Sequence, residues 1–432
     1  MTRKIQHNYV WWAILILSLV PVGLWLMAPT SSPRFNNLTN VVFSLGQLAG
    51  LIGLALFGFN LILSARFKFL DKYFKGLNNV YNKHSLLGKV AFILLLLHPM
   101  LLVFKYAGGS FWGAIYFFSL SSDWPKNFGS LALILMTLLI VLTLYLRPKY
   151  HIWKWTHKFM GLAFYLGAMH AFLIPSDVSR YAPLKFYMLG LTSLALLIYI
   201  YRTVFGKYLI KKYEYIVENV TALNDNIWEI NMKPQNQKLE FIAGQFIFVS
   251  FLDNKIGKES HPFTISSSPD ESNLKITVKA LGDYTNKLAN LTIGTRVQIE
   301  GPFGFFHYQN SIYKNQIWVA GGIGITPFLS MVKSLKVNDN YNIDLFYCLK
   351  NYKESIYLDL LQSLEPKLKL HLFCYDKDGY LNIETIKNIS GTLAEKDIFI
   401  CSPPQMIESF KKQFIGQGVD KKLIHSEEFN FR

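Results

Sequence analysis

The chain has 432 residues, of which 51% are hydrophobic and 16% aromatic, and its formal net charge is +16. This length allows two or three domains, and the hydrophobic and aromatic content is high for a soluble protein. The three cysteines (Cys348, Cys374 and Cys401) form no CxxC pair, which argues against a disulfide framework or a zinc site and excludes a four-cysteine iron–sulfur cluster.

Six long apolar segments fill the first half of the chain. Most approach or exceed the roughly 20 residues that a helix needs to cross a bilayer. The first could instead be a signal peptide, because Arg3 and Lys4 precede it, but its length and the Trp-Trp pair near its start favour a retained helix. We therefore predict a membrane-spanning helical bundle, whose segments lie near residues 10–27, 40–64, 84–105, 127–146, 156–174 and 183–203.

The basic residues predict the orientation of these segments, because cytoplasmic loops of membrane proteins carry an excess of lysine and arginine. With the N-terminus inside, fifteen basic residues fall on the cytoplasmic side and five on the outer side. The positive charge is thus mostly a topology signal, and we expect no nucleic-acid partner, which would need a basic soluble patch. We predict a multi-pass protein of the cell membrane, with its N-terminus and its second half in the cytoplasm.

Histidines stand at matched positions in two of the apolar segments. His84 and His98 are fourteen residues apart, and His157 and His170 are thirteen apart. As helices, these intervals span about 21 Å and about 19–20 Å. Both segments run from the inner to the outer face in the predicted topology, so His84 lies level with His157 and His98 with His170. Each pair offers both axial ligands for one haem iron.

Histidines at helix ends can also be ordinary polar residues. Ionisable side chains within a membrane are costly and usually functional, however, and four of them at matched depth favour haem. Fourteen residues return a side chain to within about 40° of the same helix face, whereas thirteen leave it about 140° away. We therefore expect the helix with His157 and His170 to be distorted, or its histidines to reach their haems from different flanks. His151 is predicted to lie in a loop.

After residue 207 the pattern changes to short alternating strands bounded by turn residues, such as EYIVENV and LKITVKAL. Residues 208–311 are predicted to form an all-β domain. Residues 312–432 alternate strands with helices, which is typical of a parallel sheet that binds a nucleotide. The segments that carry this pattern are QIWVA, PFLSMVKSL, IDLFYCL, SIYLDLLQSL, LHLFCY and DIFICS.

A glycine-rich turn, VAGGIGITPF, joins the first strand and helix of the last domain. Gly321, Gly322 and Gly324 allow a tight turn and a close backbone approach, and the N-terminus of the helix that follows attracts a pyrophosphate. Alone this motif is weak, since any tight strand–helix turn can use glycine, and it lacks the GK[ST] ending of a P-loop. Further motifs are GQF, HPFTISS, KALGDYT and GPFG before it, and CSPP and EEFNFR after it.

Together these motifs resemble those of the ferredoxin–NADP reductase superfamily. With the membrane half, nearly the whole chain resembles the NADPH oxidase and ferric reductase family in its compact bacterial form, whose haem histidines are similarly spaced. The resemblance implies a six-helix transmembrane di-haem domain (1–207), a β-barrel FAD-binding domain (208–311) and an α/β nicotinamide-nucleotide-binding domain (312–432). It implies FAD, two b-type haems and NADPH or NADH as cofactors.

The resemblance also implies roles for single residues. Phe263 would pack on the isoalloxazine and Thr264 would lie near its reactive nitrogen, with Cys401 near the nicotinamide. Lys350 stands where the family often has an arginine for the 2′-phosphate, and since a lysine lacks the guanidinium fork, the choice between NADPH and NADH stays open. The implied flavin-site residues are His261, Pro262, Phe263, Thr264, Ser266, Lys279, Gly282 and Thr285. The implied nucleotide-site residues are Gly321, Gly322, Gly324, Thr326, Lys350, Cys401, Pro403 and Phe431.

The C-terminal FNFR places Phe429 and Phe431 on the same side of an extended segment. The two rings either close the core of the nucleotide domain, or, as the resemblance implies, Phe431 stacks on the isoalloxazine and moves aside when nicotinamide reacts. With Thr264 and Cys401, Phe431 completes the implied catalytic residues.

These features imply a transmembrane NAD(P)H oxidase. Electrons would pass from cytoplasmic NAD(P)H through FAD, the inner haem and the outer haem to external oxygen. Histidine on both sides of the iron leaves oxygen no ligand position, so the transfer would be outer-sphere and give superoxide. The alternatives are a ferric or cupric reductase and, against the four histidines, a transporter or channel regulated by nucleotide. No EF-hand and no long regulatory loop is apparent, so we expect no obligatory protein activator.

Overall fold

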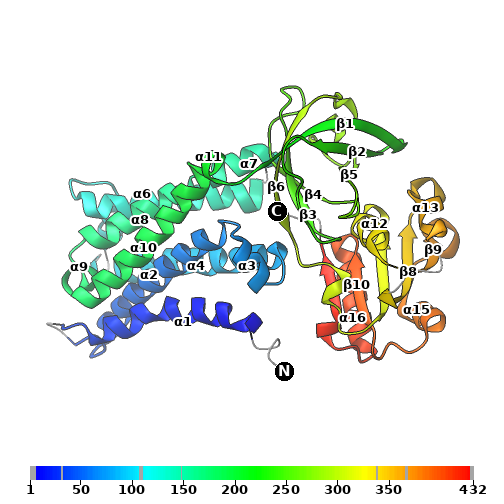
Figure 1. Cartoon of the computed structure of the whole chain (residues 1–432). Coiled ribbons are helices and arrows are strands. Elements are labelled where there is room, and N and C mark those ends of the chain that lie inside the picture. Colours follow the sequence, from blue (N-terminus) through cyan, green and yellow to red (C-terminus); the bar gives the residue numbers. More distant parts are fainter. Residues whose placement is uncertain are drawn as a thin grey trace. The chain divides into compact units, whose positions relative to one another are not determined.

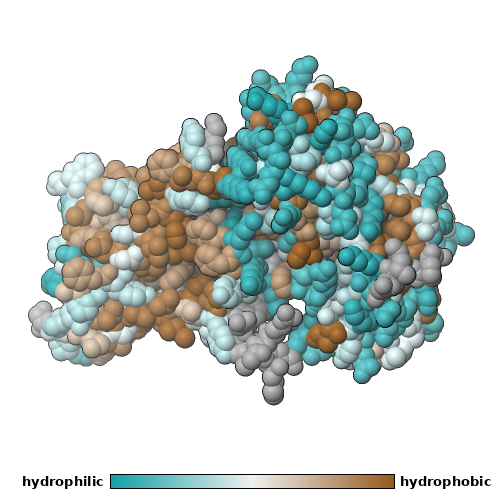
Figure 2. Space-filling view, viewed as in Figure 1, coloured by the Kyte–Doolittle hydropathy of each residue, from teal (hydrophilic) through white to brown (hydrophobic). Residues whose placement is uncertain are grey.

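The computed structural model describes residues 6–30, 33–106, 110–146, 148–336, 339–364 and 368–428. The chain divides into two compact units. The first comprises Met1–Phe74 and Asn79–Ile210, and the second Lys75–Asn78 and Lys211–Arg432. The first unit is helical, whereas the second contains the sheets (Figure 1). Their surfaces differ accordingly: hydrophobic residues cover much of the helices, and hydrophilic residues dominate the second unit (Figure 2).

The helical unit is built mainly from long apolar helices, and two of them, α2 and α6, begin at polar caps. The Asn37 side chain accepts a hydrogen bond from the backbone N–H of Asn40 (2.8 Å), and the Asp123 carboxylate accepts one from Lys126 (3.3 Å). The helices are α1 (Gln6–Met27), α2 (Leu38–Leu63), α3 (Lys68–Tyr73), α4 (Leu77–Tyr106), α5 (Phe111–Phe118), α6 (Trp124–Val141) with a π-helical extension (Leu142–Leu146), α7 (Tyr150–His157), α8 (Met160–Leu173), α9 (Asp177–Arg180), α10 (Ala182–Thr203) and α11 (Gly206–Leu209).

Among the described residues, five helical segments are long and apolar enough to cross a membrane. Many of their large side chains point away from the protein; Ile93, Leu138 and Leu197 are 56%, 58% and 65% exposed. Continuous helices that present such side chains on all sides fit a hydrocarbon environment, where every backbone group must be bonded within the chain. The segments are Tyr9–Met27, Leu38–Leu63, Leu77–Tyr106, Trp124–Leu146 and Ala182–Thr203.

The apolar segment near residues 156–174 is interrupted. Helix α7 ends at His157, the chain turns at Lys158 and Phe159, and α8 begins at Met160. Helix α8 has fourteen residues, about 21 Å, which is shorter than the ~30 Å hydrocarbon core of a bilayer. The expected distortion between the two histidines is therefore present, whereas the six spanning helices stay a prediction.

The loop prediction for His151 was wrong, because this residue lies within α7. Aromatic rings at helical spacing stabilise this short helix: Tyr150 packs on Trp153 with ring centres 5.6 Å apart, and Trp153 stacks on His157 at 5.4 Å. Such i, i+3 and i, i+4 contacts favour a helix where the sequence had predicted a loop.

The second unit begins with an antiparallel sheet of six described strands, in the order β4-β3-β6-β1-β2-β5. A bridge between Ile265 and Ile276 joins its two edges and closes the sheet into a barrel. Alternate residues such as Val297 and Ile299 are buried inside it. The strands are β1 (Tyr213–Asn224), β2 (Ile227–Pro234), β3 (Phe246–Phe251), β4 (His261–Thr264), β5 (Leu274–Lys279) and β6 (Arg296–Phe303).

A parallel sheet follows, with the described strands in the order β11-β10-β7-β8-β9. Its side chains alternate between two cores: Trp318 packs with α12 on one face, and Val319 packs with α15 and α16 on the other. The strands are β7 (Asn315–Gly321), β8 (Asn342–Leu349), β9 (Lys369–Cys374), β10 (Asp397–Cys401) and β11 (Ile424–Glu427). The helices are α12 (Ile325–Ser334), α13 (Leu358–Ser363), α14 (Tyr375–Asp378), α15 (Ile383–Ser390) and α16 (Pro404–Gly416).

The architecture agrees with the sequence prediction of a membrane-helical region, then a β-barrel and a parallel α/β sheet. The helix predicted in SIYLDLLQSL is shorter than expected, because Tyr357 adopts a left-handed backbone conformation and α13 begins only at Leu358. Strand β11 was not predicted; it lies at a sheet edge and has only four residues, too few for a periodic signal. The domain boundaries after residues 207 and 311 stay predictions.

Candidate functional site

The four membrane histidines form two pairs across α4 and α7–α8. The ring centres of His84 and His157 lie 6.2 Å apart, and those of His98 and His170 lie 6.3 Å apart. The ring planes are inclined by 70° and 71°. The interruption after His157 lets a thirteen-residue interval present both of its rings to α4, which an unbroken helix would not allow.

Backbone carbonyls fix the orientation of three of these rings. The carbonyl oxygen of Gly46 lies 2.8 Å from Nδ1 of His98, and that of Pro125 lies 2.8 Å from Nδ1 of His170. In the inner pair, the Asn60 carbonyl lies 3.0 Å from Nδ1 of His84. A carbonyl can only accept, so each Nδ1 carries the proton and Nε2 keeps its lone pair for a metal. This arrangement is typical of metal-binding histidine.

His157 is held differently. Its ring stacks on Trp153, and its Nδ1 lies 3.5 Å from Oγ1 of Thr143, a long distance for a hydrogen bond. Packing rather than a backbone carbonyl therefore sets the orientation of this ring.

The geometry of both pairs fits one metal ion each, bound between the two rings. A bound imidazole nitrogen lies about 2.0–2.1 Å from a transition metal and roughly 1 Å from its own ring centre, so two rings on opposite sides place their centres about 6–6.5 Å apart. The distances of 6.2 and 6.3 Å fall in this range. Bis-histidine ligation of a haem iron is the arrangement that uses two such ligands per metal.

Two glycines make room for the outer pair, and sequence reasoning missed them. A Cβ atom on Gly50 would lie 2.6 Å from Nδ1 of His98, and one on Gly129 would lie 2.8 Å from Nδ1 of His170. Each glycine stands four residues after the residue whose carbonyl meets that histidine, so it lies directly above the carbonyl on the same helix face. The two spacings, Gly46 to Gly50 and Pro125 to Gly129, are a signal that the sequence did contain.

The flavin motif lies on β4, at one edge of the barrel sheet. Thr264 is buried, and its Oγ1 has no hydrogen-bond partner among the described residues. A buried hydroxyl without a partner costs free energy unless a ligand satisfies it, which fits the implied contact with a flavin nitrogen. Phe263 is half-buried, and His261 stacks on Tyr284 with ring centres 3.7 Å apart. Pro262 lies between them in the strand.

The other predicted flavin residues occupy neighbouring positions. Ser266 is fully buried, and its Oγ accepts a hydrogen bond from Thr277 (3.0 Å). Lys279, at the end of β5, forms an ion pair with Glu354 (3.7 Å). The Thr285 hydroxyl accepts a hydrogen bond from the N–H of Gly282 (3.1 Å), which folds residues 282–285 into a turn. These contacts order the motifs locally, and their roles toward FAD stay predictions.

The nucleotide motifs meet at the point where the strand order of the parallel sheet reverses. Strands β7 and β10 are neighbours there, and the chain leaves both at their carboxyl ends, the place where open α/β sheets bind ligands. A Cβ atom on Gly324 would lie 2.1 Å from the carbonyl oxygen of Cys401, so the two loops can approach only because residue 324 is glycine. A Cβ atom on Gly321 would lie 2.7 Å from Cβ of Ser402 and 3.0 Å from Cδ of Pro403.

The other residues predicted for the nucleotide site differ in how deeply they are buried. Thr326 is buried in the first turn of α12, whereas Lys350 and Pro403 are exposed at the ends of β8 and β10. Cys401 is completely buried, and burial together with the nearby Glu427 raises the pKa of its thiol well above the usual range. The thiol therefore stays protonated and is no nucleophile. Phe431 lies outside the described residues.

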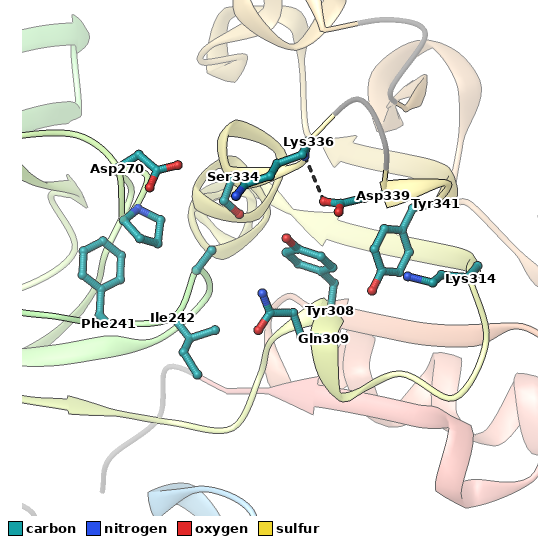
Figure 3. Close-up of a pocket in the computed structure, with 12 residues that line it drawn as sticks. Phe241, Ile242, Asp270, Tyr308, Gln309, Lys314, Ser334, Lys336, Asp339 and Tyr341 are labelled. Atoms are coloured by element: carbon teal, nitrogen blue, oxygen red, sulfur yellow. Dashed lines mark hydrogen bonds between the residues drawn. The ribbon is translucent and has the colours of Figure 1, made fainter.

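A cavity of about 370 Å³ opens elsewhere in the second unit (Figure 3). Tyr308 and Tyr341 meet edge-on there with ring centres 5.0 Å apart, and the Lys314 ammonium lies 3.8 Å from the ring centre of Tyr341. None of the predicted flavin or nucleotide residues lines this cavity, so it is separate from the candidate site.

Three protein families match consecutive parts of the chain. Residues 49–168 match the ferric reductase like transmembrane component, residues 213–307 an FAD-binding domain, and residues 318–412 an oxidoreductase NAD-binding domain. Membrane helices joined to flavin and nicotinamide domains define an oxidoreductase, as predicted. This order of domains is that of the NADPH oxidase and ferric reductase family, with a dehydrogenase half of the ferredoxin–NADP reductase type, which confirms the resemblance seen in the motifs.

Individual relatives match about half of the chain. NADH-cytochrome b5 reductase 1 of Kluyveromyces lactis is 25% identical over 237 residues, covering 51% of this chain and 84% of that protein. The glycine betaine monooxygenase reductase subunit of Pseudomonas aeruginosa is 29% identical over 208 residues, covering 44% of this chain and 56% of the subunit. A ferredoxin NADP+ reductase structure from Neisseria gonorrhoeae, with bound FAD and NADP, covers 51% of this chain and 99% of its own, with a TM-score of 0.46 and 19% identity.

The glycines beside the outer histidines provide a first test. Gly50→Ala or Gly129→Ala should displace the adjacent ring, because the new Cβ would lie 2.6 or 2.8 Å from its Nδ1. We expect each purified variant to lose the outer haem and keep the inner one, measured from haem content and the visible spectrum. Gly190→Ala in α10, where a Cβ meets nothing within 4 Å, is the matched control and should keep both. Full haem content in the first two variants would refute the assigned packing.

A second test concerns the two nucleotide loops. Gly324→Ala places a Cβ against the Cys401 carbonyl, and relieving this overlap should cost about 1–3 kcal/mol of stability. It should also weaken nicotinamide-nucleotide binding, because the loops must separate. Gly416→Ala, in a helix of the same domain with open space around it, should be neutral or slightly stabilising. Thermal unfolding and equilibrium nucleotide binding of the two variants give the comparison; equal behaviour contradicts the close approach.

Proposed function

We propose that the chain is a transmembrane NAD(P)H oxidase that moves electrons from cytoplasmic NAD(P)H to oxygen on the outer side and produces superoxide. This proposal rests on the two histidine pairs, which lie at two levels of one helical bundle. The ring centres are 6.2 Å apart in one pair and 6.3 Å apart in the other. Ionisable residues within a membrane are costly, so four of them in matched positions favour a redox path across it.

The cofactors of this proposal are FAD, two b-type haems and NADPH or NADH. When bound, the flavin would accept a hydride, which carries two electrons, and pass these electrons on one at a time. The haems would be the one-electron carriers within the bilayer. His84 and His157 would hold the inner haem, and His98 and His170 the outer one. The buried hydroxyl of Thr264 would form a hydrogen bond with the flavin. The loops after β7 and β10 would bind the nucleotide.

The orientation and the choice of nucleotide belong to the proposal as well. The excess of basic residues on one side, fifteen against five, supports a cytoplasmic N-terminus and a cytoplasmic second unit. Lys350 is exposed at the end of β8 and could place one positive charge near a 2′-phosphate. It cannot form the two parallel hydrogen bonds that an arginine would, so it favours NADPH over NADH only weakly.

A ferric or cupric reductase is the second candidate, and the match of residues 49–168 to a ferric reductase like transmembrane component favours it. The two candidates share the same cofactors and differ only in the final acceptor. Histidine on both sides of each iron would suit either, because both acceptors would then take electrons without binding to the haem iron.

The haem assignment has a direct spectroscopic test. The purified protein should show the spectrum of low-spin b-type haem with about two haems per chain, since each pair supplies both axial ligands. His98→Ala or His170→Ala should remove the outer haem and leave the inner one at least partly intact. His151→Ala, which changes an exposed histidine of the same unit, should leave the spectrum unchanged. Undiminished haem in both ligand variants would sink the assignment.

The acceptor is decided by a parallel assay. Membranes containing the protein should oxidise NADPH or NADH with oxygen and release superoxide, detected by a signal that superoxide dismutase abolishes. Anaerobic assays with a ferric chelate and with a cupric chelate measure the alternative. We expect the oxygen reaction to be faster, and to be lost in His98→Ala. Metal reduction that persists while superoxide is absent would replace the oxidase proposal by the reductase one.

A further inference from the structure

The loop that follows β8 crosses from the nucleotide sheet to the barrel. This strap, defined here as residues 350–357, contacts three strands of the barrel. The Lys353 carbonyl accepts a hydrogen bond from Asn224 on β1 (3.5 Å), and Glu354 forms an ion pair with Lys279 on β5 (3.7 Å). The third contact, to β2, is made by Tyr357, the last residue of the strap. The strap begins at Lys350, so one short segment links the candidate nucleotide site to the flavin-bearing barrel.

Tyr357 makes the closest of these contacts. Its hydroxyl donates to the Glu229 carboxylate on β2 (2.7 Å) and lies 2.8 Å from Oγ1 of Thr277 on β5. Burial, with the Glu229 carboxylate beside it, raises the pKa of Tyr357 above its usual range, so the hydroxyl keeps its proton. A hydrogen bond from a neutral hydroxyl to a carboxylate is charge-assisted, and one of this length is among the stronger side-chain hydrogen bonds.

The contact continues into the flavin motif. Oγ1 of Thr277, which lies 2.8 Å from the Tyr357 hydroxyl, is also within hydrogen-bond distance of Oγ of Ser266 (3.0 Å). Both Ser266 and Thr277 are buried, at 0% and 6% exposure, so water does not replace these bonds. Ser266 follows Thr264, the predicted flavin contact, by two residues. Three hydroxyls therefore connect the strap to the strand that carries the flavin motif.

Helix α12, which begins at the glycine loop, holds the same segment from a second direction. The Ser330 hydroxyl donates to the Ser267 carbonyl (2.7 Å), and Lys333 pairs with Glu271 (3.6 Å). Burial alone would raise the pKa of Glu271, but the Ser268 N–H and the ammonium groups of Lys333 and Lys275 lower it. Residues 266–271 are thus fixed between α12 and the strap, both of which come from the nucleotide domain.

The backbone of Tyr357 is consistent with a special position. Its φ is +59° and its ψ +23°, a left-handed conformation that a bulky residue adopts at a cost of order 1–3 kcal/mol. Glycine or asparagine would suit this backbone better. A tyrosine that bears this cost while its hydroxyl reaches across to the barrel indicates that the reach itself is needed.

We propose that Tyr357 is a positioning residue for hydride transfer: its hydroxyl locks the nucleotide domain onto the flavin-bearing strands, so that nicotinamide and flavin meet in one fixed register. The inference rests on the proposed function in so far as NAD(P)H reduces bound FAD. Since the strap also carries Lys350, a nucleotide held there is placed relative to the flavin by the same hydroxyl. Reaction rates fall steeply with misplacement, by roughly a hundredfold for 1 Å.

Tyr357→Phe removes only the hydroxyl and keeps the ring. In the full-length protein loaded with FAD, stopped-flow mixing with NADPH or NADH without oxygen should show the limiting rate of flavin reduction lowered by about tenfold, with the nucleotide Kd changed less than about twofold, because register and not affinity is lost. In the protein without nucleotide, hydrogen–deuterium exchange should rise at residues 350–357 and in β5. Tyr380→Phe, the same change on a ring 81% exposed, is the control and should alter neither quantity.

A second pair of variants covers the case that Tyr357→Phe does not bind FAD. Thr277→Ser keeps the hydroxyl between Tyr357 and Ser266 and should behave as wild type, whereas Thr277→Val should be slow and show faster exchange. Combined with Tyr357→Phe, Thr277→Val should add little, since both break one chain of hydroxyls. Unchanged rate and exchange in Tyr357→Phe, or equal behaviour of the serine and valine variants, would overturn the inference. Failure of wild type to take up FAD or to be reduced would instead defeat the proposed function.

Discussion

The membrane unit depends on how a polar imidazole is accommodated inside an apolar bundle. Each buried ring needs a partner for its N–H, and in a helix the backbone carbonyls are already engaged with their own chain. The carbonyls of Gly46 and Pro125 serve both bonds, because the next turn of their helices presents glycine and leaves the oxygen open from the side. The orientation of the two outer rings follows from this local arrangement.

The second unit meets a different requirement, since two domains must present two cofactors to each other. The nucleotide motifs meet where the strand order reverses between β7 and β10, and β4 carries the flavin motif. Hydrogen bonds join residues 266–271 to α12 and Tyr357 to β2 and β5. They add to an apolar contact, in which Phe306 packs on Phe328 and Phe399. Such bonds fix direction as well as distance, which apolar packing does less strictly.

Much of this architecture could be predicted from sequence, because its signals are periodic or local. The apolar segments, the alternating strands and the glycine turn at Gly321–Gly324 can each be recognised from their own stretch of sequence, without knowing what they pack against. The break at Lys158 and Phe159 was expected only as some distortion, since spacing restricts angles without locating the bend. The role of Gly50 depends on a ring from another helix, and the reach of Tyr357 depends on strands more than seventy residues away. Contacts of that kind are properties of the fold and leave no periodic trace.

The closure of the barrel has a consequence for the behaviour of the chain among its neighbours. Without the bridge between Ile265 and Ile276, β4 and β5 would be open edges, and an open edge can pair with a strand of another molecule. The strand that carries the flavin motif is thereby withdrawn from intermolecular pairing, even when no cofactor covers it. The edges of the parallel sheet are blunted otherwise: β11 has only four residues, and β9 begins with the charged Lys369. The edges of the two sheets are thus closed, short or charged.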